Sequence, residues 1–349
     1  MGAVRVYFAT NRNELPDNKK LVFGPRFNPD GVAALRFGHV DFPDGVETLQ
    51  GGAVHVYPDI KGEPDVSKTG GGQFLDDLRE AMLAGRDTLV FIHGFNVTFA
   101  GAIEAGARLA REVRIRSGAV ADEGRPVNVV VFSWPSDGEA VPYMSYYSDR
   151  EDARASGPAV ARVYLKLRDF LKTVRVEDRC ERSVHLMAHS MGAYVLRQGL
   201  QAVIAKDSDS LVRMFDQILL AAPDEDDDAF ELDSKLKPLP RIGRQVTVYF
   251  NPSDRALVVS DKTKGNPDRL GSDGPRLIDM LPKKVVLVDC RNVAGDADAL
   301  IQHSYYARSR AMAFDIGAVL AGMDAETIGN RTYVLPLRAW RIAGELSAP

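Results

Sequence analysis

The chain has 349 residues, a formal net charge of −4 and 45% hydrophobic residues, a composition typical of a globular protein with a sizeable core. Lysine and arginine are scattered among acidic residues, which excludes the basic stripe that a nucleic-acid partner requires. No apolar run approaches the roughly 18 residues of a membrane span, and no signal-type block opens the sequence, so we expect a cytoplasmic protein without a membrane span.

Apolar and polar residues alternate in the N-terminal region, residues 1–60, most clearly over residues 35–42. This alternation predicts half-exposed antiparallel strands. Three consecutive glycines follow at 70–72. The neighbouring lysine precedes them, whereas a phosphate-binding loop has its lysine after the glycines. We therefore expect a flexible loop that enters a helix over residues 73–83.

From residue 89 the pattern changes to near-continuous apolar runs, which are typical of strands buried on both faces. The runs are Leu89–Ile92, Val129–Phe132, Val184–Met187, Ile218–Ala221, Val246–Phe250 and Val285–Val288. Apolar residues recur at spacings of three and four over residues 99–113 and 160–171, which predicts helices packed on the sheet. This order predicts an α/β fold: a mostly parallel central sheet with antiparallel N-terminal strands, helices on both faces and at most a small cap.

The sequence Ala188-His189-Ser190-Met191-Gly192 lies between a predicted strand and a helix-compatible segment. Small side chains at positions 188 and 192 allow a sharp strand-to-helix turn that presents a nucleophilic serine. A base can then reach the hydroxyl and activate it. Ser190 is therefore the candidate nucleophile.

A serine on such a turn needs a histidine base and a supporting acid, and both follow it in chain order. Five of the six histidines precede Ser190, which leaves His303 as the candidate base. Asp254 follows a predicted strand and is the candidate acid, while Asp224, one strand earlier, is the alternative. Asp224 opens an acidic run over 224–228 that has a competing explanation at a helix start, and we expect this run to be solvated.

The oxyanion of an acyl-transfer reaction needs two backbone N–H donors. Met191, directly after the serine, is one candidate. Phe95, in the loop after the strand over 89–92, is the other. We expect the ring of His93 to pack beneath this loop, and His189 to point away from Ser190.

Together these motifs resemble the α/β-hydrolase superfamily, and more closely a bacterial esterase- or lipase-like family of that fold, known as a domain of unknown function. The resemblance spans most of residues 4–310. It is carried by Thr10-Asn11-Arg12, Phe37-Gly38, His93-Gly94-Phe95-Asn96, Ser133-Trp134-Pro135-Ser136, Ala188 to Gly192, Ala221-Ala222-Pro223-Asp224 and Asn251 to Leu257. It implies a serine hydrolase that acts through an acyl-enzyme.

Aromatic residues gather after the strand over 129–132, where an open sheet borders its ligand crevice. Trp134, Tyr143 and Tyr146 either line an acyl pocket there or pack in the interior. The absence of a long insertion between strands predicts an accessible cleft for a small-molecule ester with a short or medium acyl chain. Amide or peptide cleavage, acyl transfer by the same triad, and a non-catalytic binding role remain alternatives.

We expect residues 1–349 to form a single domain, with a catalytic core at 89–310 and a C-terminal extension at 325–349. Within the extension, Thr332–Leu335 either adds an edge strand or packs on the surface. The two cysteines, Cys180 and Cys290, are expected at opposite ends of the sheet as free thiols. No metal or cofactor is expected.

Overall fold

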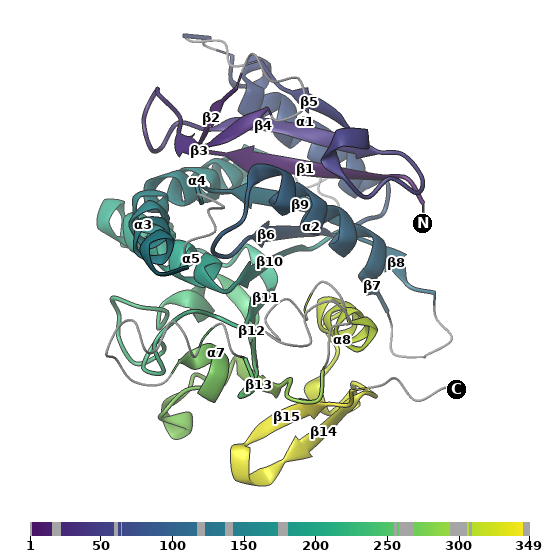
Figure 1. Cartoon of the computed structure of the whole chain (residues 1–349), viewed down its shortest axis with the longest axis vertical. Helices are drawn as coiled ribbons and strands as arrows, with labels where there is room; N and C mark the ends of the chain where they lie inside the picture. The colour runs from purple at the N-terminus through teal and green to yellow at the C-terminus, as the bar shows by residue number, and fades with distance from the viewer. Residues whose placement is uncertain are drawn as a thin grey trace.

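A large central sheet organises the chain in the computed structural model (Figure 1). The structure describes residues 2–15, 22–58, 62–63, 65–116, 123–136, 142–173, 181–254, 257, 269–293, 306 and 309–344. The strands of the sheet are β1 (Val4–Thr10), β4 (Arg36–Phe42), β5 (Ala53–Val56), β6 (Thr88–Ile92), β9 (Asn128–Ser133), β10 (Val184–His189), β11 (Phe215–Ala221), β12 (Gly243–Phe250), β13 (Val285–Asp289), β14 (Arg331–Val334) and β15 (Ala339–Ile342). Two short strand pairs lie outside it: β2 (Arg12–Glu14) with β3 (Phe23–Phe27), and β7 (Arg114–Ile115) with β8 (Arg125–Pro126).

The order of strands across the sheet is β14-β15-β13-β12-β11-β10-β6-β9-β1-β4-β5. Neighbouring strands from β1 to β15 in this order pair in parallel. β4 and β5 are antiparallel at one edge, and β14 is antiparallel to β15 at the other. The predicted mostly parallel sheet with antiparallel N-terminal strands is therefore confirmed, and residues 331–334 form its far edge strand.

Helices cover both faces of the sheet. They are α1 (Gly70–Leu83), α2 (Phe99–Glu112), α3 (Pro142–Ala155), α4 (Gly157–Thr173), α5 (Met191–Lys206), α7 (Leu270–Asp273) and α8 (Arg310–Leu320). Side chains of α1, α4 and α5 share one core cluster, and those of α2 and α8 share the other. Successive strand residues alternate between the two clusters, as Leu186 and Met187 do in β10, because side chains of a strand point to opposite faces. Continuous apolar runs are therefore needed in these strands.

Two N-terminal expectations are corrected. The glycines at 70–72 form the first turn of α1 and not a loop, because the Thr69 hydroxyl accepts a hydrogen bond from the Gly72 N–H at 3.1 Å and caps the helix. A Cβ at Gly72 would lie 2.0 Å from the Val66 carbonyl oxygen, so the turn requires glycine there. β4 is buried along most of its length and is not half-exposed, because α1 packs against it.

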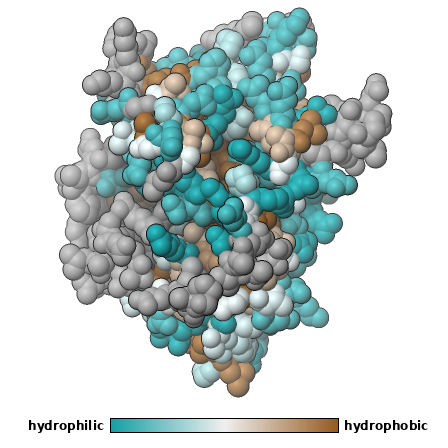
Figure 2. Space-filling model, turned by 90° about the vertical axis from the view of Figure 1, so that its right-hand side faces the viewer, coloured by the Kyte–Doolittle hydropathy of each residue, from teal (hydrophilic) through white to brown (hydrophobic). Residues whose placement is uncertain are grey.

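The β14–β15 hairpin forms the lower end of the molecule in Figure 1, and Figure 2 shows apolar side chains at this end. Tyr333 and Leu335 are exposed in this part of the chain. Arg331 ties the hairpin to α8 through two hydrogen bonds to Asp315, at 2.6 and 2.7 Å. Within the described residues, no helix combines the length and apolar character needed to cross a membrane.

Candidate active site

Ser190 occupies the turn between β10 and α5 with φ 52° and ψ −125°, a conformation that L-residues rarely adopt. Its N–H donates a hydrogen bond to the Ala221 carbonyl at 3.0 Å. Its own carbonyl accepts from the N–H groups of Ala193 at 3.0 Å and Asp224 at 3.1 Å. Backbone strain of this kind persists only where the surroundings enforce it, and it clusters at functional sites.

Glycines on two sides allow the backbone to pass close to Ser190. A Cβ at Gly192 would lie 2.5 Å from the Ile92 carbonyl oxygen, which confirms that position 192 needs a small residue. A Cβ at Gly94 would lie 2.9 Å from the Ser190 Cβ, so the loop after β6 passes directly beside the serine. Among the described residues, the N–H groups of Phe95 and Met191 have no hydrogen-bond acceptor.

His93 lies beneath this loop, as predicted. Its Nδ1 lies 2.9 Å from the Gly94 carbonyl oxygen, and its Nε2 accepts a hydrogen bond from the Trp134 N–H at 3.2 Å. Complete burial lowers the pKa of His93 to about 3, with a further contribution from the positive charge of Arg12. The imidazole is therefore neutral and serves as a support. His189 also has a packing contact, because its ring centroid lies 4.2 Å from that of Tyr306.

The three aromatic residues considered for substrate binding have different environments. Trp134 has no exposed surface, stacks on His93 and donates its indole N–H to the His93 carbonyl at 2.9 Å. This environment favours the packing alternative for Trp134, because an enclosed ring does not reach a substrate. Tyr146 lies on α3 with its ring 5.6 Å from that of Phe95. The side chain of Tyr143 lies outside the described residues.

A polar network that the sequence analysis missed holds the loop after β6. Asn96 has φ 57°, and its N–H donates to a carboxylate oxygen of Asp149 at 3.0 Å. The Ser136 hydroxyl donates to the same oxygen at 2.5 Å and accepts from the Val97 N–H at 3.1 Å. Buried Arg12 donates to the Val97 carbonyl at 2.7 Å. Arg12 and Ser136 lie in motifs that carried the family resemblance, but no sequence pattern joined them to this loop.

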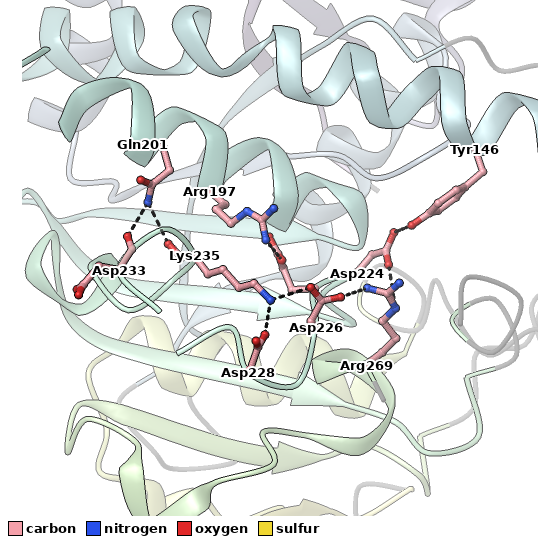
Figure 3. Close-up of polar contacts among 10 residues, drawn as sticks. Tyr146, Arg197, Gln201, Asp224, Asp226, Asp228, Asp233, Lys235 and Arg269 are labelled. Carbon is pink, nitrogen blue, oxygen red and sulfur yellow. Dashed lines mark hydrogen bonds and ion pairs between the residues drawn. The ribbon is translucent and has the colours of Figure 1, made fainter. Parts of the chain in front are cut away.

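The two candidate acids differ in their partners. A carboxylate oxygen of Asp224 accepts a hydrogen bond from the Tyr146 hydroxyl at 2.6 Å, and the other lies 3.8 Å from the Arg269 Nε (Figure 3). Asp254 follows β12, is fully buried, and accepts from the Leu257 N–H at 3.3 Å. His303 lies outside the described residues. Asp224 thus has one hydrogen-bond donor and one ion-pair partner in Tyr146 and Arg269, and Asp254 stays the candidate acid that the sequence favours.

The acidic run is not solvated, which corrects the sequence-based expectation. Asp226 pairs with Arg269 at 2.6 Å and with Lys235 at 2.8 Å, and Lys235 also contacts Asp228 (Figure 3). Glu225 is buried and pairs with Arg197 of α5 at 2.7 Å. Burial nevertheless raises the pKa of Glu225 to about 6. Arg197 and Arg269 compensate these carboxylates from distant parts of the chain, and sequence proximity does not reveal such partners.

The sheet, the strained serine between strand and helix, and the close-packed loop beside it together define an α/β hydrolase. The chain belongs to the family described as alpha/beta hydrolase of unknown function (DUF900), whose model matches residues 74–322. No curated protein matches the sequence. Among solved structures, a lipase-esterase related protein from Clostridium acetobutylicum ATCC 824 is similar, with 12% identity over 58% of this chain and 84% of that chain. The TM-score of this match is 0.25.

Proposed function

We propose that the protein is a serine hydrolase that cleaves carboxylic esters through an acyl-enzyme on Ser190. The observation that carries the proposal is the strained backbone of Ser190, which three hydrogen bonds hold at the carboxyl end of a central parallel strand. Such strain costs roughly 1–3 kcal/mol and is retained where it presents a functional group. The serine hydroxyl is the nucleophile that this turn presents in α/β hydrolases.

In the proposed reaction, the Ser190 Oγ attacks the ester carbonyl carbon while His303 accepts its proton and Asp254 orients the imidazole. The N–H groups of Phe95 and Met191 bind the oxyanion of the tetrahedral intermediate. The intermediate collapses by breaking the bond to the alcohol, which takes the proton from His303. Water then attacks the acyl-enzyme by the same route and releases the carboxylic acid.

We infer short or medium acyl chains as the substrate class, with Tyr146 beside the acyl group. The short distance of 5.6 Å between the Tyr146 and Phe95 ring centroids supports the position of Tyr146 beside the acyl group. The acyl-chain length follows from the absence of a long insertion between strands. Tyr143 precedes Tyr146 on the same helix, and we propose that it also binds the substrate.

The test is hydrolysis of p-nitrophenyl esters from acetate to palmitate, with the corresponding anilides alongside. Ser190→Ala and His303→Ala should each lower kcat by roughly three to six orders of magnitude, with little further loss when combined. The exposed residues Ser208 and His55 provide matched controls as Ser208→Ala and His55→Ala, and both should keep wild-type rates. Full activity in Ser190→Ala would contradict the proposal. Faster cleavage of anilides would replace esterase by amidase chemistry, and a maximum at palmitate would overturn the chain-length inference.

A further inference from the structure

A groove of about 630 Å³ runs between α1 and α4 on one face of the sheet. This volume lies within the roughly 300–1,000 Å³ of small-molecule sites. The groove reaches the middle of the sheet, because Val90 of β6 lines it and is only half-buried although β6 is a central strand. Its walls are apolar side chains such as Leu75 and Leu78 of α1 and Val163 and Leu167 of α4.

The groove is separate from the candidate active site. It is lined by residues at the start of β6 and β10, including Thr88 and Val184. Ser190 follows the opposite end of β10. In a parallel sheet these two ends lie at opposite edges, so a ligand of the groove does not need to touch the nucleophile.

The charge of the groove contrasts with the charge of the chain. Its described lining contains one acid, Asp216, although the whole chain carries a net charge of −4. The basic residues that line it are Arg79, Lys166, Arg168, Lys172, Arg182, Arg213 and Arg244. Arg244 pairs with Asp216 at 2.6 Å, and Arg168 pairs with Asp169 at 2.7 Å. The described lining therefore carries more positive than negative charge, which favours an anionic ligand.

Three of these cations lie in segments at the amino edge of the sheet. Lys172 lies in the last turn of α4, Arg182 lies just before β10, and Arg213 just before β11. The apolar walls extend from this edge toward Phe37 and Gly71. The groove therefore has basic residues at one end and apolar walls along the rest of its length.

The apolar floor selects the kind of anion. A peptide laid along it would bury backbone N–H and C=O groups against apolar side chains, and each unpaired group would cost free energy. A polymethylene chain has no such groups and gains from the same burial. We propose that the groove binds a free fatty acid, with its chain between α1 and α4 and its carboxylate at Lys172, Arg182 and Arg213.

Calorimetric titration of the full chain with decanoate and dodecanoate, each below its micelle concentration, tests this site. Two added methylenes should tighten the Kd by roughly tenfold, because the chain is buried on apolar surface. Dodecyltrimethylammonium, which has the same chain and the opposite charge, should not bind. Ser190→Ala should bind dodecanoate as the wild type does, so a protein that hydrolyses no ester would leave this proposal standing.

Two variants locate the ligand. Arg182→Glu and Arg213→Glu should each weaken dodecanoate binding, and their combination should weaken it at least tenfold. Arg26→Glu, an exposed change on β3 that alters the charge as much as either single variant, should leave binding unchanged. Leu167→Trp fills the groove from α4 and should also weaken binding. Equal Kd values in the charge variants, or equal binding of the ammonium compound, would overturn the proposal. So would a dimer that does not bind dodecanoate and that Leu167→Trp dissociates, since the groove would then be covered by a second copy.

Discussion

Individual residues beside Ser190 show which parts of the site depend on local sequence and which depend on the fold. Ser190 and Gly192 could be predicted because a sharp strand-to-helix turn restricts residue type within five positions. Arg12 and Asp149 could not, because they reach the loop after β6 from distant segments. The partners of Asp224 could not be predicted for the same reason, because Tyr146 and Arg269 are remote from it in sequence. Residue type and chain order alone did not separate Asp224 from Asp254.

The acid of the proposed triad can be identified by comparing two amide substitutions. Asp254→Asn should lower kcat by about four orders of magnitude, because the histidine loses the carboxylate that orients it. Asp224→Asn should leave kcat within about tenfold and lower stability instead, because Arg269 loses a buried anionic neighbour. Steady-state kinetics and urea unfolding of both variants check these outcomes. A larger loss of kcat in Asp224→Asn would reverse the assignment.

His93 makes stability depend on pH. Its pKa is lowered from 6.5 to about 3 in the folded protein, so the unfolded chain binds a proton below pH 6.5 that the folded protein does not. Proton binding therefore favours the unfolded chain as the pH falls below 6.5. The contribution of His93 lowers the free energy of unfolding by roughly 2 kcal/mol between pH 7 and pH 5, and the loss continues as the pH falls toward 3. Burial raises the pKa of Glu225 to about 6, which adds stability at pH 5 and opposes the loss in every variant. The test is therefore a difference: in urea unfolding, the wild type and His55→Gln, an exposed control, should lose roughly 2 kcal/mol more stability between pH 7 and pH 5 than His93→Gln. An equal pH dependence in all three would contradict the neutral, buried imidazole.

Secondary-structure elements were predictable to the extent that their buried surfaces are apolar. The central strands appear as continuous apolar runs because helices cover both faces. The sequence did not predict a helix over α3, because its buried side includes Asp149, which is hydrogen-bonded to the neighbouring loop. The start of α1 was missed because a close contact at Gly72 outweighs the low helix propensity of glycine.

The function of α3 as a support for the loop after β6 can be tested at Asp149. Asp149→Ala leaves the Asn96 N–H and the Ser136 hydroxyl without their shared acceptor. We expect kcat to fall by roughly 10- to 100-fold with a smaller change in KM, since the loop carries the proposed oxyanion donor Phe95. Asp149→Asn, which keeps an acceptor oxygen, should recover part of the loss. Glu151→Ala, an exposed change on the same helix, is the control, and equal kinetics in both alanine variants would refute the role.

At the scale of the whole molecule, the sheet separates functions and joins distant segments. Its carboxyl edge holds Ser190, and its amino edge borders the basic groove between α1 and α4. The C-terminal extension belongs to the same sheet through β14 and β15. A buried ion pair between Arg331 and Asp315 anchors it, and Asp315 also accepts a hydrogen bond from the Tyr249 hydroxyl at 2.9 Å.

Loss of this anchor should affect the whole fold. Arg331→Ala leaves the carboxylate of Asp315 buried without its cation, which should lower the free energy of unfolding by about 3–5 kcal/mol. Arg310→Ala, an exposed change at the start of α8, should alter it by less than about 0.5 kcal/mol. Chemical denaturation of the two variants measures the difference. Equal stability would mean that the extension is not integrated with the core.

The central claim, that Ser190 is a nucleophile activated by the fold, is tested most directly by a fluorophosphonate, which phosphonylates activated serines. Mass spectrometry of the treated protein should find one adduct, on the peptide that contains Ser190. The adduct should be absent in Ser190→Ala and present in Ser208→Ala. A wild-type protein without an adduct, or an adduct that persists in Ser190→Ala, would contradict the account.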